Sequence, residues 1–291
     1  MSLKNETKKY SILLTIAMLF WGGGWSALKI LTYELPLDVV VFWRFFLMSV
    51  AFVPILYFFK QPFVINKKAL LFIGASSVLN IAFMFASFLG MKEGLAGAGS
   101  VIITTFSPIL TFVLVAILFH KKVSNTQLFG LFLGVVGGYI LLELHHPELL
   151  FQGGNVYFLL CALIWAGVTL LSQYSHVHIH PIHYSFAISI VATIFTFFYA
   201  QESDLKTVFS QGKEFWAALL YLAIFGQAIA TTIFFIASGK LGSQKTSSFM
   251  FLVPVFALFT AWILLDEEMQ LHIIVGGLLS MLAVYFINKK F

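Results

Sequence analysis

Ten apolar stretches divide this chain, and each is long enough to cross a lipid bilayer as an α-helix. Spanning the hydrocarbon core takes roughly 20 apolar residues, because a helix rises about 1.5 Å per residue. The connections are short, so consecutive helices must run antiparallel. The stretches are approximately 10–31, 37–59, 69–91, 95–119, 124–143, 154–174, 181–200, 215–238, 244–265 and 269–287. The expected fold is therefore an all-α integral membrane protein with ten transmembrane helices.

Charged residues are too scarce for a water-soluble protein of this length. They make up 10% of the 291 residues, whereas soluble domains carry about 25%. The single cysteine, Cys161, excludes an internal disulfide and a multi-cysteine metal site, and we expect no metal and no cofactor. The net charge of +5 does not indicate a nucleic-acid partner, because membrane topology accounts for the basic residues.

The charges segregate between the two sides of the predicted bundle. With both termini placed in the cytoplasm, 12 of the 17 basic residues lie on the inner side and 11 of the 12 acids on the outer side. The inner residues are Lys4, Lys8, Lys9, Lys60, Lys67, Lys68, Lys121, Lys122, Lys240, Lys245, Lys289 and Lys290. Basic residues near helix ends stay cytoplasmic during insertion. We therefore expect a multi-pass protein of the bacterial cytoplasmic (inner) membrane with both termini cytoplasmic.

The two halves of the sequence match one another at a shift of about 145 residues. The coinciding pairs are Trp21/Trp165, Pro36/Pro181, Leu95/Leu241, Pro108/Pro254 and Gly130/Gly276. Each half holds five spans, so the second half enters the membrane from the opposite side, as in many secondary transporters. The pattern predicts two inverted five-helix repeats, residues 1–146 and 150–291.

Several short motifs resemble the EamA-type transporters of the drug/metabolite transporter superfamily. They are "FWGGGWSALK" in the first span, "FWRFF" in the second, and the paired prolines and glycines above. The resemblance covers nearly the whole chain and implies a ten-helix fold with a central cavity that exports small metabolites such as amino acids. The family's acidic residue after the ninth helix is kept at Asp266–Glu268, whereas His120-Lys121-Lys122 replaces the one after the fourth.

Polar and aromatic residues recur at the middle of the predicted spans, where such transporters bind substrate. The substrate-binding candidates at this depth are Trp21, Trp25, Asn80, Thr104, Ser107, Trp165, Gln227 and Thr231. For the tryptophans, ordinary packing is an equal alternative. For the amides the alternative is an interhelical hydrogen bond, and for the hydroxyls a bond to the carbonyl of the preceding turn.

Two basic residues lie inside the predicted membrane region. Arg44 follows Asp38 by six residues, which places it about 9 Å into the membrane. Because a charge at that depth needs a partner or water, Arg44 is either half of an ion pair or a ninth substrate-binding candidate. Lys29 lies closer to the outer interface, where its side chain can reach water. We expect a positive potential in the outer half of the cavity.

The function that these features favour is secondary transport of a small-molecule substrate by alternating access, with membrane lipid as the surrounding partner. A lipid or lysolipid flippase, a passive channel and a lipid-modifying membrane enzyme are alternatives. The sequence lacks a G-x-S-x-G nucleophile elbow and an H-E-x-x-H zinc motif, so we do not expect an enzyme.

Two further patterns leave alternatives open. Gly130, Gly134 and Gly138 recur every four residues, a spacing that lets helices approach closely, either within the monomer or in a homodimer. His176, His178, His180 and His183 could bind a metal, although a polar cytoplasmic loop explains them equally well.

Overall fold

Helices make up every regular element in the described part of the chain. The computed structural model describes residues 3–59, 65–94, 96–142, 150–265 and 271–289. The first half holds α1 (Leu3–Glu34), α2 (Leu37–Phe59), α3 (Lys67–Glu93), α4 (Ala96–Phe119) and α5 (Asn125–Leu141). The second holds α6 (Gly154–Ser175), α7 (Pro181–Tyr199), η2 (Leu205–Ser210), α8 (Lys213–Tyr221), η3 (Leu222–Thr231), α9 (Thr232–Leu241), α10 (Ser243–Ser248), η4 (Phe249–Leu252), α11 (Val253–Leu265) and α12 (Leu271–Asn288).

The membrane-spanning character of the chain is clear from these helices. Eight helices among the described residues are long and apolar enough to cross a membrane, with α8, η3 and α9 forming one continuous span, Lys213–Leu241. The expected span 124–143 falls on α5, a shorter apolar helix of 17 residues. The expected span 244–265 falls on three consecutive pieces, α10, η4 and α11.

Local sequence signals set several helix starts. The Asn66 side chain accepts a hydrogen bond from the Ala69 N–H at 2.8 Å and caps α3. Ser124 and Gln127 form a reciprocal capping box at the start of α5. His180 caps α7, and Pro181 occupies the first turn, where its missing N–H costs nothing.

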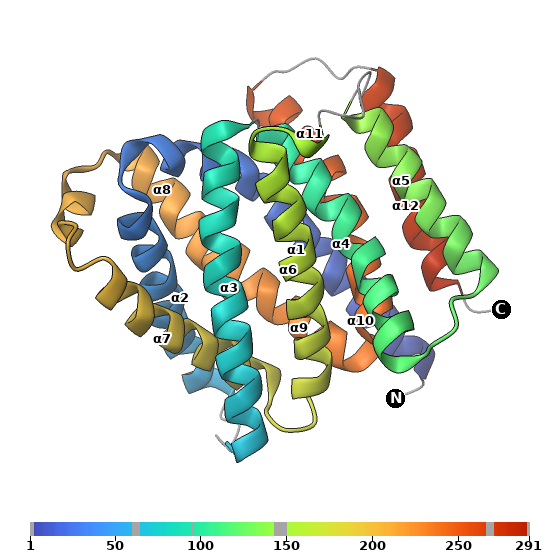
Figure 1. The fold of residues 1–291 in the computed structure, drawn as a ribbon, viewed down its shortest axis with the longest axis horizontal. Helices are drawn as coiled ribbons and strands as arrows, with labels where there is room; N and C mark the ends of the chain where they lie inside the picture. Colours follow the sequence, from blue (N-terminus) through green and yellow to red (C-terminus); the bar gives the residue numbers. More distant parts are fainter. Residues whose placement is uncertain (1–2, 60–64, 95, 143–149, 266–270, 290–291) are drawn as a thin grey trace.

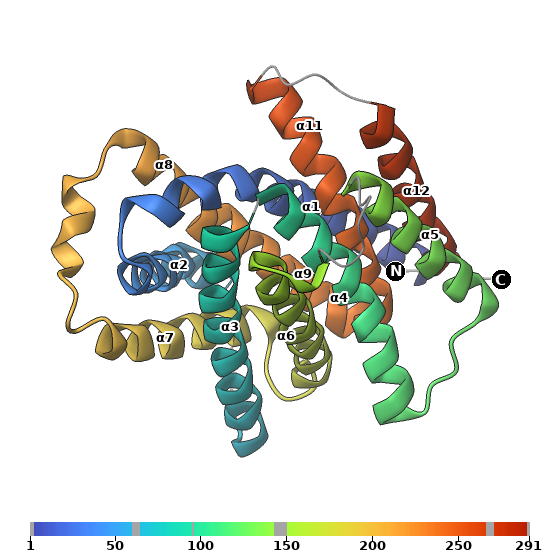
Figure 2. The ribbon, with the colours of Figure 1, turned by 45° about the horizontal axis from the view of Figure 1, so that its top comes forward.

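Helices α5 and α12 lie side by side at one side of the molecule (Figure 1, Figure 2). Their contact is made of small residues, as the glycine spacing predicts. A Cβ atom added at Gly137 would lie 2.9 Å from the Gly276 carbonyl oxygen, and one at Gly276 would lie 2.9 Å from the Gly137 oxygen. Gly130 meets Ala283 and Ile287 of α12 in the same way. This glycine face is therefore used for packing inside the monomer.

The three consecutive glycines of α1 serve two different neighbours. A Cβ at Gly22 would lie 2.8 Å from the backbone nitrogen of Ala257, so the backbones of α1 and α11 are in close contact. A Cβ at Gly23 would lie 2.6 Å from the Tyr221 hydroxyl, and one at Gly24 would lie 3.0 Å from Leu222. The glycines thus let α1 approach both α11 and the α8–η3 span.

Candidate functional site

A cavity of about 120 Å³ lies among the helices of both halves of the chain. Its lining comes from α1 to α4, from α6, α7, η3 and α9, and from η4 and the first residue of α11. Most of the lining is aromatic or aliphatic, with a few polar groups, as small-molecule sites usually are.

Eight of the nine candidate residues line this cavity. They are Trp21, Trp25, Arg44, Asn80, Thr104, Trp165, Gln227 and Thr231. Ser107 is not among the lining residues: it is fully buried between α4 and α6, where its hydroxyl donates to the Ala162 carbonyl at 3.2 Å. The sequence interpretation missed other lining residues, including Ser87, Ser185, Ile188, Phe235, Met250 and Val253.

The two tryptophans that the repeat pairs in sequence also pair in space. The rings of Trp21 and Trp165 meet edge to face, with centroids 5.2 Å apart, an arrangement that aromatic quadrupoles favour. Phe234 contacts both rings, and Phe83 contacts Trp165. Packing and a cavity-lining position therefore occur together at these residues.

An unusual stretch of helix borders the cavity opposite Trp21. Residues Leu222–Thr231 form a π-helix, with i→i+5 hydrogen bonds in place of i→i+4. Within it, the Gly226 carbonyl accepts the Trp21 Nε1–H at 2.9 Å and the Thr231 hydroxyl at 3.2 Å. The Tyr221 hydroxyl donates back to the Phe20 carbonyl at 3.1 Å. Side-chain hydrogen bonds thus join α1 to this span in both directions.

The amide and hydroxyl candidates differ in how their hydrogen bonds are satisfied. Asn80 donates its Nδ2 to the Ser76 carbonyl at 2.8 Å, and Thr104 donates to the Ser100 carbonyl at 2.6 Å. The alternative expectation for the hydroxyls, a bond to the preceding turn, is therefore correct for Thr104. Gln227 Oε1 and Trp165 Nε1 are buried and have no hydrogen-bond partner in the described part of the protein.

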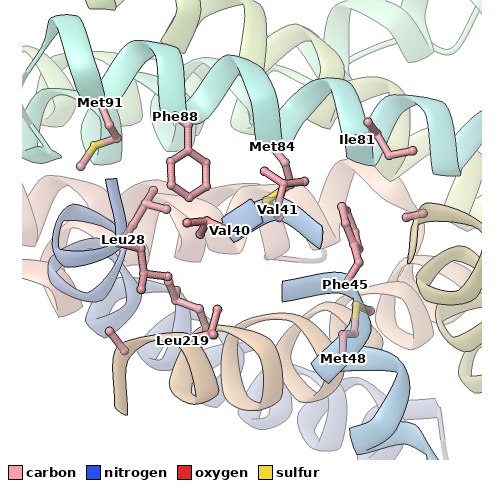
Figure 3. Close-up of a cluster of buried hydrophobic side chains, with 14 of the residues drawn as sticks. Leu28, Val40, Val41, Phe45, Met48, Ile81, Met84, Phe88, Met91 and Leu219 are labelled. Carbon is pink, nitrogen blue, oxygen red and sulfur yellow. The ribbon is translucent and has the colours of Figure 1, made fainter. Parts of the chain in front are cut away.

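Arg44 is buried beside an aromatic ring. Its side chain is 5% exposed, and its guanidinium carbon lies 5.9 Å from the centre of the Phe88 ring. Figure 3 shows the hydrophobic cluster to which Phe88 belongs, in which Phe88 and Met84 of α3 face Leu28 of α1 and Phe45 of α2. The contact between the Arg44 guanidinium and the Phe88 ring is a cation–π interaction.

No counter-ion reaches Arg44 from the described residues, where its Nε has no hydrogen-bond partner. Of the acids that the sequence places nearest to Arg44 in the predicted topology, Glu34 and Glu93 are exposed, and Glu143 lies outside the described residues. Lys29 is exposed and does not line the cavity, which agrees with a side chain that reaches water.

The histidine-rich connection between α6 and α7 has a structural role. No group of three or more metal-ligating side chains occurs among the described residues. His176 packs against Gly239, and His180 caps α7. Burial, followed by the charge of Lys240, lowers the pKa of both His176 and His180, and His180 adds to the effect on His176.

Comparison with known proteins agrees with this geometry. Residues 8–142 and 152–289 each match the EamA-like transporter family. An uncharacterized transporter of Archaeoglobus fulgidus is 26% identical over 97% of this chain and 98% of its own length. The uncharacterized transporter YoaV of Bacillus subtilis is 24% identical over 92% of each chain. A protein of Escherichia coli named "Probable amino-acid metabolite efflux pump" is 25% identical over 96% of this chain and 94% of its own.

The fold also occurs in a solved crystal structure. That chain superposes with a TM-score of 0.75 over 97% of this chain and 96% of its own, at 14% sequence identity. At this identity the likeness concerns the fold alone.

Proposed function

This chain belongs to the EamA-like transporter family, and on that premise we propose that it is a secondary transporter exporting small organic metabolites such as amino acids. The observation that carries the proposal is the cavity of about 120 Å³, which both halves of the chain line. A site at such a junction can face either side of the membrane when the halves rock against each other. The name of the Escherichia coli relative, "Probable amino-acid metabolite efflux pump", supports amino-acid metabolites as the first substrate class to test.

The proposed mechanism is alternating access of two inverted five-helix repeats, residues 1–146 and 150–291, in ten spans. The two separate family matches support this division. The lysine and acid distribution supports a bacterial inner-membrane location with both termini cytoplasmic. α1 begins and α12 ends at the same side of the bundle (Figure 1), as an even number of spans requires.

Irregular helices beside the cavity supply the points at which the halves can bend. Kinks and π-turns are the usual places where helices deform. Here they are the π-helix η3 and the 3-10 turn η4, whose last residue, Leu252, precedes Pro254 by two positions. Alternating access predicts that both change conformation between the inward-open and outward-open states.

Counterflow in proteoliposomes tests the proposal. Vesicles loaded with an unlabelled amino acid should accumulate the labelled one, and the rate should saturate with concentration. Gln227→Leu, which removes a buried amide from the cavity lining, should abolish accumulation. Tyr139→Phe, on the exposed face of α5, is the matched control and should leave it unchanged. Flux without saturation would indicate a channel, and movement of a labelled lysolipid alone would indicate a flippase.

A further inference from the structure

The charge balance of the cavity points to the kind of substrate that it takes. Arg44 is the one charged side chain among the described residues that line the cavity. It is 5% exposed and has no hydrogen-bond or ion-pair partner in the described part of the chain. A buried charge without a partner is strongly disfavoured. The described lining therefore carries a positive charge with no negative charge beside it, and an anion would neutralise that charge.

The other unpartnered polar groups in the lining are mainly donors. Trp165 Nε1 can only donate, the Ser185 hydroxyl can donate, and both are buried without a partner. The Gln227 amide can present either its oxygen or its nitrogen to a ligand. The described lining contains neutral acceptors but no carboxylate, so it offers no full negative charge to an ammonium group.

The aromatic residues do not make up for this lack. Aromatic faces can bind a cation, but the Trp165 ring is already packed against Trp21, Phe83 and Phe234, with centroid distances of 5.2, 5.1 and 5.9 Å. Phe88, which has the Arg44 guanidinium beside it, is not among the lining residues. A second cation in the cavity would be repelled by Arg44 across a medium of low dielectric constant.

We propose that the site prefers a small monocarboxylate anion with an apolar body, and that Arg44 binds the carboxylate. The planar guanidinium can hold a carboxylate with two parallel hydrogen bonds. The apolar body would lie against the aliphatic and aromatic lining, within a cavity of about 120 Å³. The zwitterionic amino acid of the same skeleton binds more weakly, because its ammonium group adds a second positive charge. This inference rests on the proposed transport function and narrows its substrate class.

Four compounds with one carbon skeleton test the charge preference on the unmodified protein. They are 3-methylbutanoate (an anion), 3-methylbutanamide (neutral), 3-methylbutylamine (a cation) and valine (the 2-amino derivative of the first compound, which is a zwitterion). Binding to the purified protein in lipid nanodiscs should be at least tenfold tighter for the anion than for each of the others. Equal or tighter binding of valine or the amine would overturn the proposal. Because this series needs no mutation, it does not depend on whether any variant folds.

Substitutions then assign the preference to Arg44. Arg44→Gln should reduce 3-methylbutanoate affinity at least tenfold and leave 3-methylbutanamide affinity unchanged. Arg44→Lys should keep the preference for the anion at a lower affinity, because lysine cannot form the two-point contact. Lys29→Gln removes the same charge from an exposed site outside the cavity and should leave the affinity ratio as it is. An unchanged ratio in Arg44→Gln would remove Arg44 from substrate recognition.

The same experiments separate this inference from the proposed function. If valine shows saturable counterflow and the anion has no advantage, the transporter proposal stands and the carboxylate proposal falls. If none of the four compounds binds and no metabolite shows saturable counterflow, both proposals fail.

Discussion

The α5–α12 contact and the α1–η3 contact both depend on glycine, yet they form different structures. At the first contact, Gly137 and Gly276 bring two regular helices together, and each glycine would clash with the other's carbonyl if it carried a Cβ. At the second, Gly23 and Gly24 admit Tyr221 and Leu222 beside a π-helix, and the cavity lies next to them. The two regular helices α5 and α12 pack closely against each other. Beside the irregular helix η3, the close approach of α1 is accompanied by a cavity.

The largest effect on stability is expected at the regular contact. Gly137→Val would force a branched side chain against the Gly276 carbonyl, 2.9 Å from the new Cβ. We expect a loss of about 3 kcal/mol of unfolding free energy, the upper end of the usual cost of overpacking. Thermal unfolding in detergent measures it. Gly74→Ala, at a position with open space around it, is the control and should not lower the melting temperature.

A smaller loss of stability, with a larger effect on transport, is expected at the irregular contact. Gly23→Ala places a Cβ 2.6 Å from the Tyr221 hydroxyl and should cost about 1–3 kcal/mol. Because α1 also borders the cavity, counterflow should fall by more than the loss of folded protein explains. Counterflow rates normalised to folded protein measure this. Equal proportional losses in Gly23→Ala and Gly137→Val would show that the two contacts do not differ in function.

A pair of matched substitutions compares the two tryptophans. Trp21→Phe removes the donor to the Gly226 carbonyl and should cost about 0.5–1.5 kcal/mol through the lost hydrogen bond. Trp165→Phe removes an N–H that has no partner among the described residues, so it loses no such bond and should destabilise less. Chemical denaturation of both variants tests the order. The reverse order would mean that the bond to the π-helix contributes little.

The smallest expected effect concerns pH. Burial and Lys240 lower the pKa of His176 and His180 in the folded state, so at mildly acidic pH the unfolded chain binds more protons than the folded one. The free energy of unfolding should therefore be highest above the histidine pKa of the unfolded chain, about 6.5, and should fall as the pH drops below that value. Melting temperatures between pH 8 and 5 measure this. His176→Gln should flatten the slope, because it removes one of the groups whose pKa is lowered.

The depth of most candidate residues could be predicted because a helix rises by a constant amount per residue. Counting along the spans placed Trp21, Asn80, Trp165 and Gln227 at one level, and the structure places all four around one cavity. The direction in which a side chain points is harder to predict in a membrane protein. Lipid and protein interior are both apolar, so hydrophobic periodicity does not mark the inner face. Ser107 has the right depth but faces α6.

Other features left no recognisable pattern in a single sequence. Ser185 lines the cavity. In the sequence, however, a serine that lines a cavity looks the same as a serine whose hydroxyl bonds to its own helix. The π-helix contains no proline, so nothing in its sequence indicates a break. Whether Arg44 has a partner depends on how distant helices pack, which the spacing of residues along the chain does not determine.

The π-helix lies in the part of the chain where the numbering of the two halves diverges. Pro181 follows Pro36 by 145 residues, whereas Pro254 follows Pro108 by 146, and η3 lies between Pro181 and Pro254. Each π-type hydrogen bond encloses one residue more than an α-type bond. Deleting one residue from η3 should therefore favour α-geometry, withdraw the Gly226 carbonyl from Trp21 and turn Gln227 to another face. The bond that joins α1 to the second half thus depends on the length of this segment to a single residue.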